Sequence, residues 1–246
     1  MEEVLAIADR ITVLRDGKLI GTMTAGEVDA SKLVRMIVGR ELAEGYPKID
    51  AEIGDPVLNV RGVDVLGDHR VSFDVRSGEI VGLPVHMGSG VSDLLSGISG
   101  QRVFDEGAVH FGSGDVTRTN MRRKIRAGLC LVPGDATTEG LISTLTIEEN
   151  ILLPNLKAYS QFGVVRRKRI RALCMEIIGL LDIRPANPNI AVRNLSGGNR
   201  QKVVIAKWLA AGARLLVMDD PTKGVDVGAK MEIYTCIGDF VGKGRA

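Results

Sequence analysis

A serine followed by two glycines and, further along the chain, a pair of aspartates have the clearest potential for chemistry. The triplet Ser196–Gly198 stands where the pattern predicts a helix over about residues 197–211. Such a start presents free backbone N–H groups and the positive end of the helix dipole to a phosphate. The apolar run Leu215–Val217 predicts a buried strand over residues 214–218, which delivers Asp219 and Asp220 at its end. Carboxylates in that place suit a magnesium ion and a water molecule.

Three segments at a fixed spacing carry a resemblance to a known family. Leu195–Gln201, Asp219–Thr222 and Gly224–Asp226 resemble the signature, Walker B and D-loop segments of an ATP-binding-cassette (ABC) ATPase, and chance rarely places all three together. Asn199–Val203 and Gly224–Lys230 further resemble tandem ATPases of bacterial carbohydrate importers of the ribose, galactose and xylose type. The resemblance implies an α/β fold of the P-loop NTPase kind: a mixed sheet, an antiparallel β subdomain and a helical subdomain that carries the signature.

The family works through paired domains. ABC ATPase domains associate head to tail, so the resemblance implies that this signature closes over ATP held by the P-loop of a partner domain. Under this interpretation Ser196, Gly197 and Gly198 bind that nucleotide, and Asp226 bridges the two sites. Gln201 is also expected to bind nucleotide. The implied cofactors are ATP and Mg²⁺. The implied partners are another ABC ATPase domain, membrane permease subunits and, indirectly, a periplasmic sugar-binding protein.

The chain's own phosphate loop departs from the family pattern. Val85–Ser92 aligns with Gly-x-x-x-x-Gly-Lys-Ser/Thr, in which backbone N–H groups wrap the phosphates, the lysine bridges the outer two and the hydroxyl binds Mg²⁺. Valine occupies the lysine position, and the loss of one such donor typically costs about 3 to 4 kcal/mol in a transition state. The residues expected to hold nucleotide weakly are Gly88, Ser89, Gly90, Val91 and Ser92, with Ser92 also a Mg²⁺ ligand.

The acid pair and a neighbouring loop differ as well. Asp220 stands where the family usually has glutamate, and the missing methylene, about 1.5 Å of reach, pulls the carboxylate away from an attacking water. Asp220 is therefore a weak catalytic residue, whereas Asp219 is expected to organise Mg²⁺. Gly134 replaces a polar residue of the family's Q-loop, and no histidine follows the Walker B segment. We expect ATP hydrolysis by the isolated chain to be absent or very weak.

Composition excludes some classes of partner. The 246 residues are 45% hydrophobic and carry 32 basic and 30 acidic side chains, so nothing in the net charge of +2 points to nucleic acid. Three cysteines without close pairing fit a reducing compartment, and no apolar run approaches the roughly 20 residues of a membrane span. The resemblance implies a cytoplasmic protein, peripheral on the inner face of the cell membrane through permease subunits.

The pattern of residues in the N-terminal part of the chain predicts a hairpin and a helix. Strands are expected over Ile11–Leu14 and Leu19–Met23, on either side of an Asp-Gly turn, followed by a helix over about residues 30–38. Residues 1–45 resemble the end of a first ABC ATPase domain, after its switch histidine. Residues 46–56, punctuated by proline and glycine, suit a linker.

A second ABC ATPase domain is expected over residues 57–246, truncated before its switch histidine. Hydrophobic periodicity and capping signals place its elements. The predicted elements are strands over 57–63 and 71–75, a buried strand over 79–83 that feeds the glycine-rich turn, helices over about 91–98 and 167–181, and a helix that starts at a capping box of Thr146 and Glu149.

These patterns favour one function and leave a second open. The favoured function is the ATP-binding component, fragment-like, of a bacterial ABC sugar importer, contributing its signature motif to a composite ATP site that energises transport. The alternative is a non-catalytic ABC-like scaffold or regulatory interaction module. Nucleotide binding separates the two, because a scaffold needs none.

Overall fold

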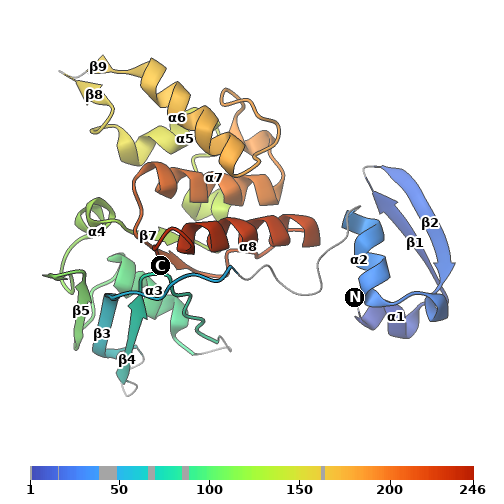
Figure 1. Ribbon diagram of the computed structural model, residues 1–246, viewed down its shortest axis with the longest axis horizontal. Helices are drawn as coiled ribbons and strands as arrows, with labels where there is room; N and C mark the ends of the chain where they lie inside the picture. Colours follow the sequence, from blue (N-terminus) through green and yellow to red (C-terminus); the bar gives the residue numbers. More distant parts are fainter. Residues whose placement is uncertain (1, 16, 39–48, 66–69, 85–88, 162–163) are drawn as a thin grey trace.

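The computed structural model describes residues 2–15, 17–38, 49–65, 70–84, 89–161 and 164–246. The path of the chain is drawn in Figure 1. A small N-terminal unit precedes a larger α/β unit in which α7 and α8 lie side by side, between the helices α5 and α6 and the antiparallel sheet of β3, β4 and β5. Within the described part of the chain, no helix is long and apolar enough to cross a membrane.

The N-terminal unit is a hairpin covered by helices. Its elements are α1 (Glu2–Ile7), β1 (Arg10–Arg15), β2 (Lys18–Thr24), the 3₁₀ turn η1 (Ala25–Glu27) and α2 (Ala30–Val38). The strands pair antiparallel, and alternation along β1 buries Ile11 and Val13 against Val28 and Leu33. The predicted strands and helix are confirmed. Asp16 of the predicted turn lies outside the described residues, and Gly17 takes the left-handed φ of +74° that such turns need.

The larger unit begins with an antiparallel sheet in the order β4-β3-β5-β6. Its strands are β3 (Pro56–Asp64), β4 (Arg70–Arg76), β5 (Ala108–Phe111) and β6 (Gly114–Asp115). One face packs against α3 (Val91–Ser99), so Val60, Val109 and Ile98 share one core. The predicted strands over 57–63 and 71–75 are confirmed.

A parallel pair of strands forms the centre. β7 (Leu129–Val132), which follows α4 (Met121–Ala127), pairs with β10 (Leu215–Met218) in the register Leu215 to Leu129. The other edge of β10 meets the end of the chain, because Leu216 N donates to Ala246 O at 2.8 Å. The apolar run therefore forms the predicted strand.

The prediction of a buried strand over 79–83 is wrong. That stretch has no regular structure, and Ile80 is 65% exposed. Gly78 N donates to Arg245 O, at the point where the last residues of the chain also meet β10. Among the described residues, no strand lies in position to pair with residues 79–83 after that contact. An apolar run becomes a buried strand only where both of its edges find partners.

Helices make up the remainder. They are the π-helical turn η2 (Ala136–Gly140), α5 (Ile147–Leu152), η3 (Leu153–Asn155), α6 (Arg167–Leu180), η4 (Val192–Asn194), α7 (Gly197–Ala210) and α8 (Val227–Val241), with the short strands β8 (Ser160–Gln161) and β9 (Val164–Val165). The predicted capping box is confirmed: Glu149 N donates to Thr146 Oγ1, and Thr146 N donates to Glu149 Oε2 at 2.8 Å. Apolar faces of α5, α6 and α7 build a second core.

The described part of the predicted linker lies against the larger unit. Ile49 contacts α8 so closely that a Cβ added to Gly238 would be 2.9 Å from its Cδ1 atom. Gly54 and Asp55 exchange backbone hydrogen bonds with Ser77. The boundaries 1–45, 46–56 and 57–246 stay predictions.

Candidate functional site

The Ser-Gly-Gly triplet forms the start of α7. Ser196 is the N-cap, in an extended conformation, and its Oγ accepts hydrogen bonds from Asn199 N at 3.4 Å and from Asn199 Nδ2 at 2.9 Å. A helix leaves its first N–H groups without acceptors inside the helix, and here these belong to Gly197 and Gly198. Ser196 and Gly197 are exposed and Gly198 is buried. The helix start therefore offers a hydroxyl and a backbone N–H group to solvent.

The start of α8 packs directly against the start of α7. Asp226 is the N-cap of α8, and its Oδ1 accepts from Ala229 N at 2.9 Å. A Cβ added to Gly198 would collide with the Ala229 methyl group, and one added to Gly197 would be 3.3 Å from Gly224 O. Close approach thus explains Gly198 and leaves little room for a side chain at Gly197. The structure brings the predicted signature and D-loop residues together.

The two aspartates follow β10 as predicted. Asp219 N donates to Val132 O at 3.0 Å and extends the pairing with β7 by one residue. Asp220 is exposed and adopts a left-handed φ of +42°, a conformation that costs most non-glycine residues about 1 kcal/mol or more. Aspartate tolerates it better than most residues. Backbone strain of this kind clusters at functional sites.

The loop after β7 lies beside the acid pair. A Cβ added to Gly134 would be 2.9 Å from Asp219 O and 4.0 Å from Lys223 Cδ, so this position has no room for a larger residue. The next residue, Asp135, caps η2 by accepting from Thr137 N and Thr138 N. Hydrogen bonds from Thr138, followed by that from Thr137, hold the pKa of Asp135 below its ordinary value. Next to Asp219 the loop therefore presents backbone in place of the polar side chain typical of the family.

The phosphate loop is described in part. Gly88 lies outside the described residues. Gly90 takes a left-handed φ of +68° at the start of α3, and Ser92 is exposed in the first turn. Val91 is partly buried against the core of the antiparallel sheet. Val91, which the sequence comparison predicts in the lysine position, therefore contributes to packing.

Sequence reasoning missed the contacts that join α7 to the loop after β7. Gln201 is only 3% exposed, and its Nε2 donates to Pro133 O at 3.4 Å. Arg200 Nη1 donates to Thr137 Oγ1 at 3.1 Å, and Lys207 Nζ donates to Gly140 O at 2.6 Å. Positions 200 and 207 share one helix face, but their partners lie 63 and 67 residues away in the sequence, so the pattern along α7 gives no sign of these contacts. Gln201 faces the protein interior here, and its predicted contact with nucleotide stays a prediction.

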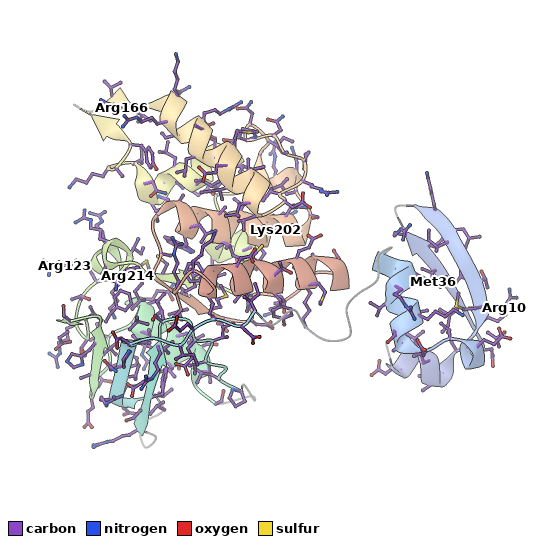
Figure 2. The ribbon with its side chains drawn as sticks, viewed as in Figure 1. Arg10, Met36, Arg123, Arg166, Lys202 and Arg214 are labelled. Atoms are coloured by element: carbon purple, nitrogen blue, oxygen red, sulfur yellow. The ribbon has the colours of Figure 1, made fainter. Side chains whose placement is uncertain are left out.

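An ion pair between a buried lysine and a partly exposed glutamate joins α7 to α8. Lys202 is 2% exposed, and its Nζ lies 2.7 Å from Glu232 Oε2 and donates to Asp182 O at 2.9 Å. In Figure 2 Lys202 is labelled between α7 and α8. A buried lysine needs such partners, because an unpaired charge in the interior is costly. This contact links α7 to α8 close to the start of each helix.

The donors present suit Mg²⁺ only in part. Mg²⁺ prefers oxygen ligands, usually one or two carboxylates together with substrate phosphates and water. Ser92 and Asp219 supply oxygen atoms of this kind. Among the described residues no three His, Cys, Asp or Glu side chains gather into a metal site. Nucleotide phosphates would have to complete the coordination.

Comparison with known proteins agrees with this geometry. The model of the ABC transporter family matches residues 69–223. The chain is 42% identical over 247 aligned positions to the ribose import ATP-binding protein RbsA of Bacillus subtilis (strain 168) and 40% identical to a putative ribose/galactose/methyl galactoside import ATP-binding protein of Agrobacterium fabrum. Each alignment covers 100% of this chain. The chain spans about half the length of these relatives, 50% in both cases.

Solved structures share the fold at lower identity. The ADP conformation of MJ1267, an ATP-binding cassette of an ABC transporter, superposes with a TM-score of 0.64 at 23% identity, covering 78% of this chain and 79% of that one. The ATP-binding cassette MJ0796 bound to ADP and Pi gives a TM-score of 0.62 at 22% identity, covering 76% and 84%. The mixed α/β fold is that of an ABC ATPase domain. From its motifs, its fold and the matched residues, the chain belongs to the ABC transporter family.

Proposed function

We propose that this chain is an ATP-binding component of a bacterial ABC sugar importer and contributes its signature motif to a composite ATP site. The observation that carries the proposal is the exposed Ser196–Gly197 start of α7, which packs against the start of α8, where Asp226 is the N-cap. The names of the relatives, which are ribose and galactose import ATP-binding proteins, support the sugar-import role. The residues that close over the partner's ATP are Ser196, Gly197 and Gly198, with Asp226 bridging the sites.

The chemistry of this site is anion binding. The hydroxyl of Ser196, the N–H of Gly197 and the positive end of the α7 dipole favour a γ-phosphate that arrives from outside the chain. The Asp226 carboxylate would repel that phosphate, and its Oδ1 already accepts from Ala229 N. In the proposal Asp226 therefore bridges the two sites by contacting the partner protein and does not bind the phosphate. The residues proposed for this half-site include no side-chain cation that would neutralise the phosphate charge. Its proposed role is therefore limited to closing over the partner's ATP.

The chain's own nucleotide site is proposed to be weak. Gly88, Ser89, Gly90, Val91 and Ser92 would contact the phosphates, and Ser92 with Asp219 would hold Mg²⁺. When bound, Mg²⁺ would neutralise phosphate charge. Val91 supplies no cation, and Asp220 is short of the position from which a glutamate orients water. We propose that ATP hydrolysis by the isolated chain is negligible.

The assembly follows from the same proposal. Residues 1–45 would be the end of a first ABC ATPase domain, residues 46–56 a linker and residues 57–246 most of a second domain. The partners would be another ABC ATPase domain, permease subunits that hold the protein at the inner, cytoplasmic face of the membrane and, indirectly, a periplasmic sugar-binding protein.

A binding experiment tests the proposal. The chain is mixed with a separately purified ABC ATPase domain that has an intact P-loop lysine, and association is measured by sedimentation with and without Mg²⁺ and a slowly hydrolysed ATP analogue. Association should require nucleotide and weaken at least tenfold in Ser196→Arg, which fills the anion site with a bulky side chain. Ser31→Arg, at an exposed serine of α2, is the matched control and should associate normally.

The alternative function predicts a different result. A scaffold or regulatory module would bind its partner equally well without nucleotide and would tolerate Ser196→Arg. That outcome would contradict the proposal and favour the scaffold.

A further inference from the structure

The side-chain amide of Asn199 joins the serine of the signature to a separate loop. Its Oδ1 accepts from Arg184 N at 2.8 Å, and its Nδ2 donates to Ser196 Oγ at 2.9 Å. Asn199 is partly buried in the first turn of α7, whereas Ser196 beside it is exposed. The amide thus lies between a backbone group and a hydroxyl that the proposed function places on phosphate.

The orientation of this amide follows from hydrogen-bond chemistry. An asparagine side chain can be turned over without a change in shape, so its oxygen and nitrogen must be assigned from their partners. The backbone N–H of Arg184 can only donate. It therefore requires the amide oxygen of Asn199, and the NH₂ group must face Ser196.

That orientation decides what Ser196 can do. A serine hydroxyl has one hydrogen to donate and two lone pairs that accept. Asn199 Nδ2 donates to Ser196 Oγ at 2.9 Å, and Asn199 N approaches the same oxygen at 3.4 Å. With its lone pairs engaged on the side of Asn199, the hydroxyl directs its hydrogen away from that residue, towards solvent.

We infer that Asn199 is a positioning residue that fixes Ser196 as a hydrogen-bond donor and so makes the start of α7 selective for an anionic acceptor of the phosphate type. The inference rests on the proposed function of Ser196. Asn199 acts through the hydroxyl and need not touch the nucleotide.

A second contact holds the loop that orients the amide. Lys202, three residues further along α7 and on the same face, donates from Nζ to Asp182 O at 2.9 Å. Asp182 also accepts from Arg184 Nε at 3.0 Å. Residues 182–184 are therefore anchored to α7 at two points, Asp182 O and Arg184 N.

An isosteric substitution tests the inference. In Asn199→Asp one carboxylate oxygen still accepts from Arg184 N, but the other faces Ser196 and takes the hydroxyl's hydrogen. We expect nucleotide-dependent association with the ABC ATPase domain described above to weaken more than tenfold. Asn194→Asp is the matched control, because it makes the same chemical change at an exposed position two residues before Ser196 and leaves the hydroxyl alone. It should weaken association less than threefold.

A structural measurement distinguishes a reversed hydrogen bond between residue 199 and Ser196 from local unfolding of the loop at Arg184. In ¹⁵N-labelled protein the Arg184 amide should keep its protection from hydrogen exchange in Asn199→Asp and lose it in Asn199→Leu, which offers no acceptor. Loss of protection in Asn199→Asp would overturn the inference, and so would equal weakening in Asn194→Asp.

The two proposals can fail separately. Should the unmodified chain show no nucleotide-dependent association, the proposed function falls, and the preference for phosphate falls with it. The orientation of the amide is checked without any partner, because Ser196→Ala should shift the Asn199 side-chain NH₂ resonances. Unchanged resonances would overturn the inference even if the proposed function holds.

Discussion

At the scale of single residues, the packing of α7 against α8 requires a glycine at position 198, because Ala229 of α8 leaves no room for a side chain there. The sequence predicted that Gly198 belongs to an anion-binding start, yet it is buried against Ala229. A pattern along α7 alone contains no information about the distance to α8. In the same way, the sequence predicted Asp220 at the end of a strand, but its left-handed backbone depends on the turn into Lys223.

Replacing Gly198 by alanine should destabilise the larger unit. The new methyl group would collide with that of Ala229, so α7 and α8 would have to separate. Overpacking of this kind typically costs about 1 to 3 kcal/mol, which urea unfolding followed by circular dichroism can measure. Gly179→Ala in α6 is the matched control, since nothing lies within 4 Å of its added Cβ. It should be neutral or stabilising by up to about 1 kcal/mol, and equal losses in both variants would contradict the prediction.

At the scale of elements, the C-terminal end of α3 is held by a buried lysine of α4. Lys124 is 1% exposed, and its Nζ donates to Gly97 O at 3.1 Å and to Ile98 O at 3.0 Å. A cation suits this end of a helix, where carbonyl groups lack partners. Burial lowers the pKa of Lys124 from 10.5 to about 8, although the charge of Asp115 acts in the opposite direction. Burial likewise lowers the pKa of Lys207 to about 8.

The lowered pKa of Lys124 predicts that stability rises with pH just above neutrality. Between about 8 and 10.5 the unfolded chain binds more protons at this lysine than the folded chain, so the free energy of unfolding increases with pH. The slope is at most about 1.4 kcal/mol per pH unit for each such lysine. Burial raises the pKa of Cys130 to about 12, which lowers stability as pH rises above about 9. The lysine effect is therefore read between pH 7.5 and 9.

The measurement is urea unfolding at a series of pH values. Lys124→Met should reduce the rise between pH 7.5 and 9 by up to about 1 kcal/mol, whatever it does to stability at pH 7.5. Lys157→Met, at an exposed position, should leave the rise as it is. A Lys124→Met variant with the full rise would show that this lysine keeps an ordinary pKa.

At the scale of the whole molecule, local patterns predicted most elements and missed those that depend on distant partners. The hairpin of β1 and β2, the capping box at Thr146 and the strand β10 carry their signals within a few residues. The stretch 79–83 also contains apolar residues, but among the described residues it pairs with no strand. The site shows the same division, since Ser196 and Asp226 were predicted from motifs whereas Arg200 and Lys202 act through contacts far apart in sequence.

The two units should differ widely in stability. The N-terminal unit buries Ile11, Val13, Val28 and Leu33, and a two-stranded hairpin with so small a core is marginal in water. We expect amides of β1 and β2 to exchange hydrogen many times faster than those of β7 and β10, which pair at the centre of the larger unit. Deletion of residues 1–48 should therefore move the melting temperature of the remaining chain by less than about 3 °C, roughly the effect of 1 kcal/mol in a unit of this size. Hydrogen exchange and calorimetry on both chains test this, and a loss of more than about 8 °C would mean that the N-terminal unit is an integral part of the larger core.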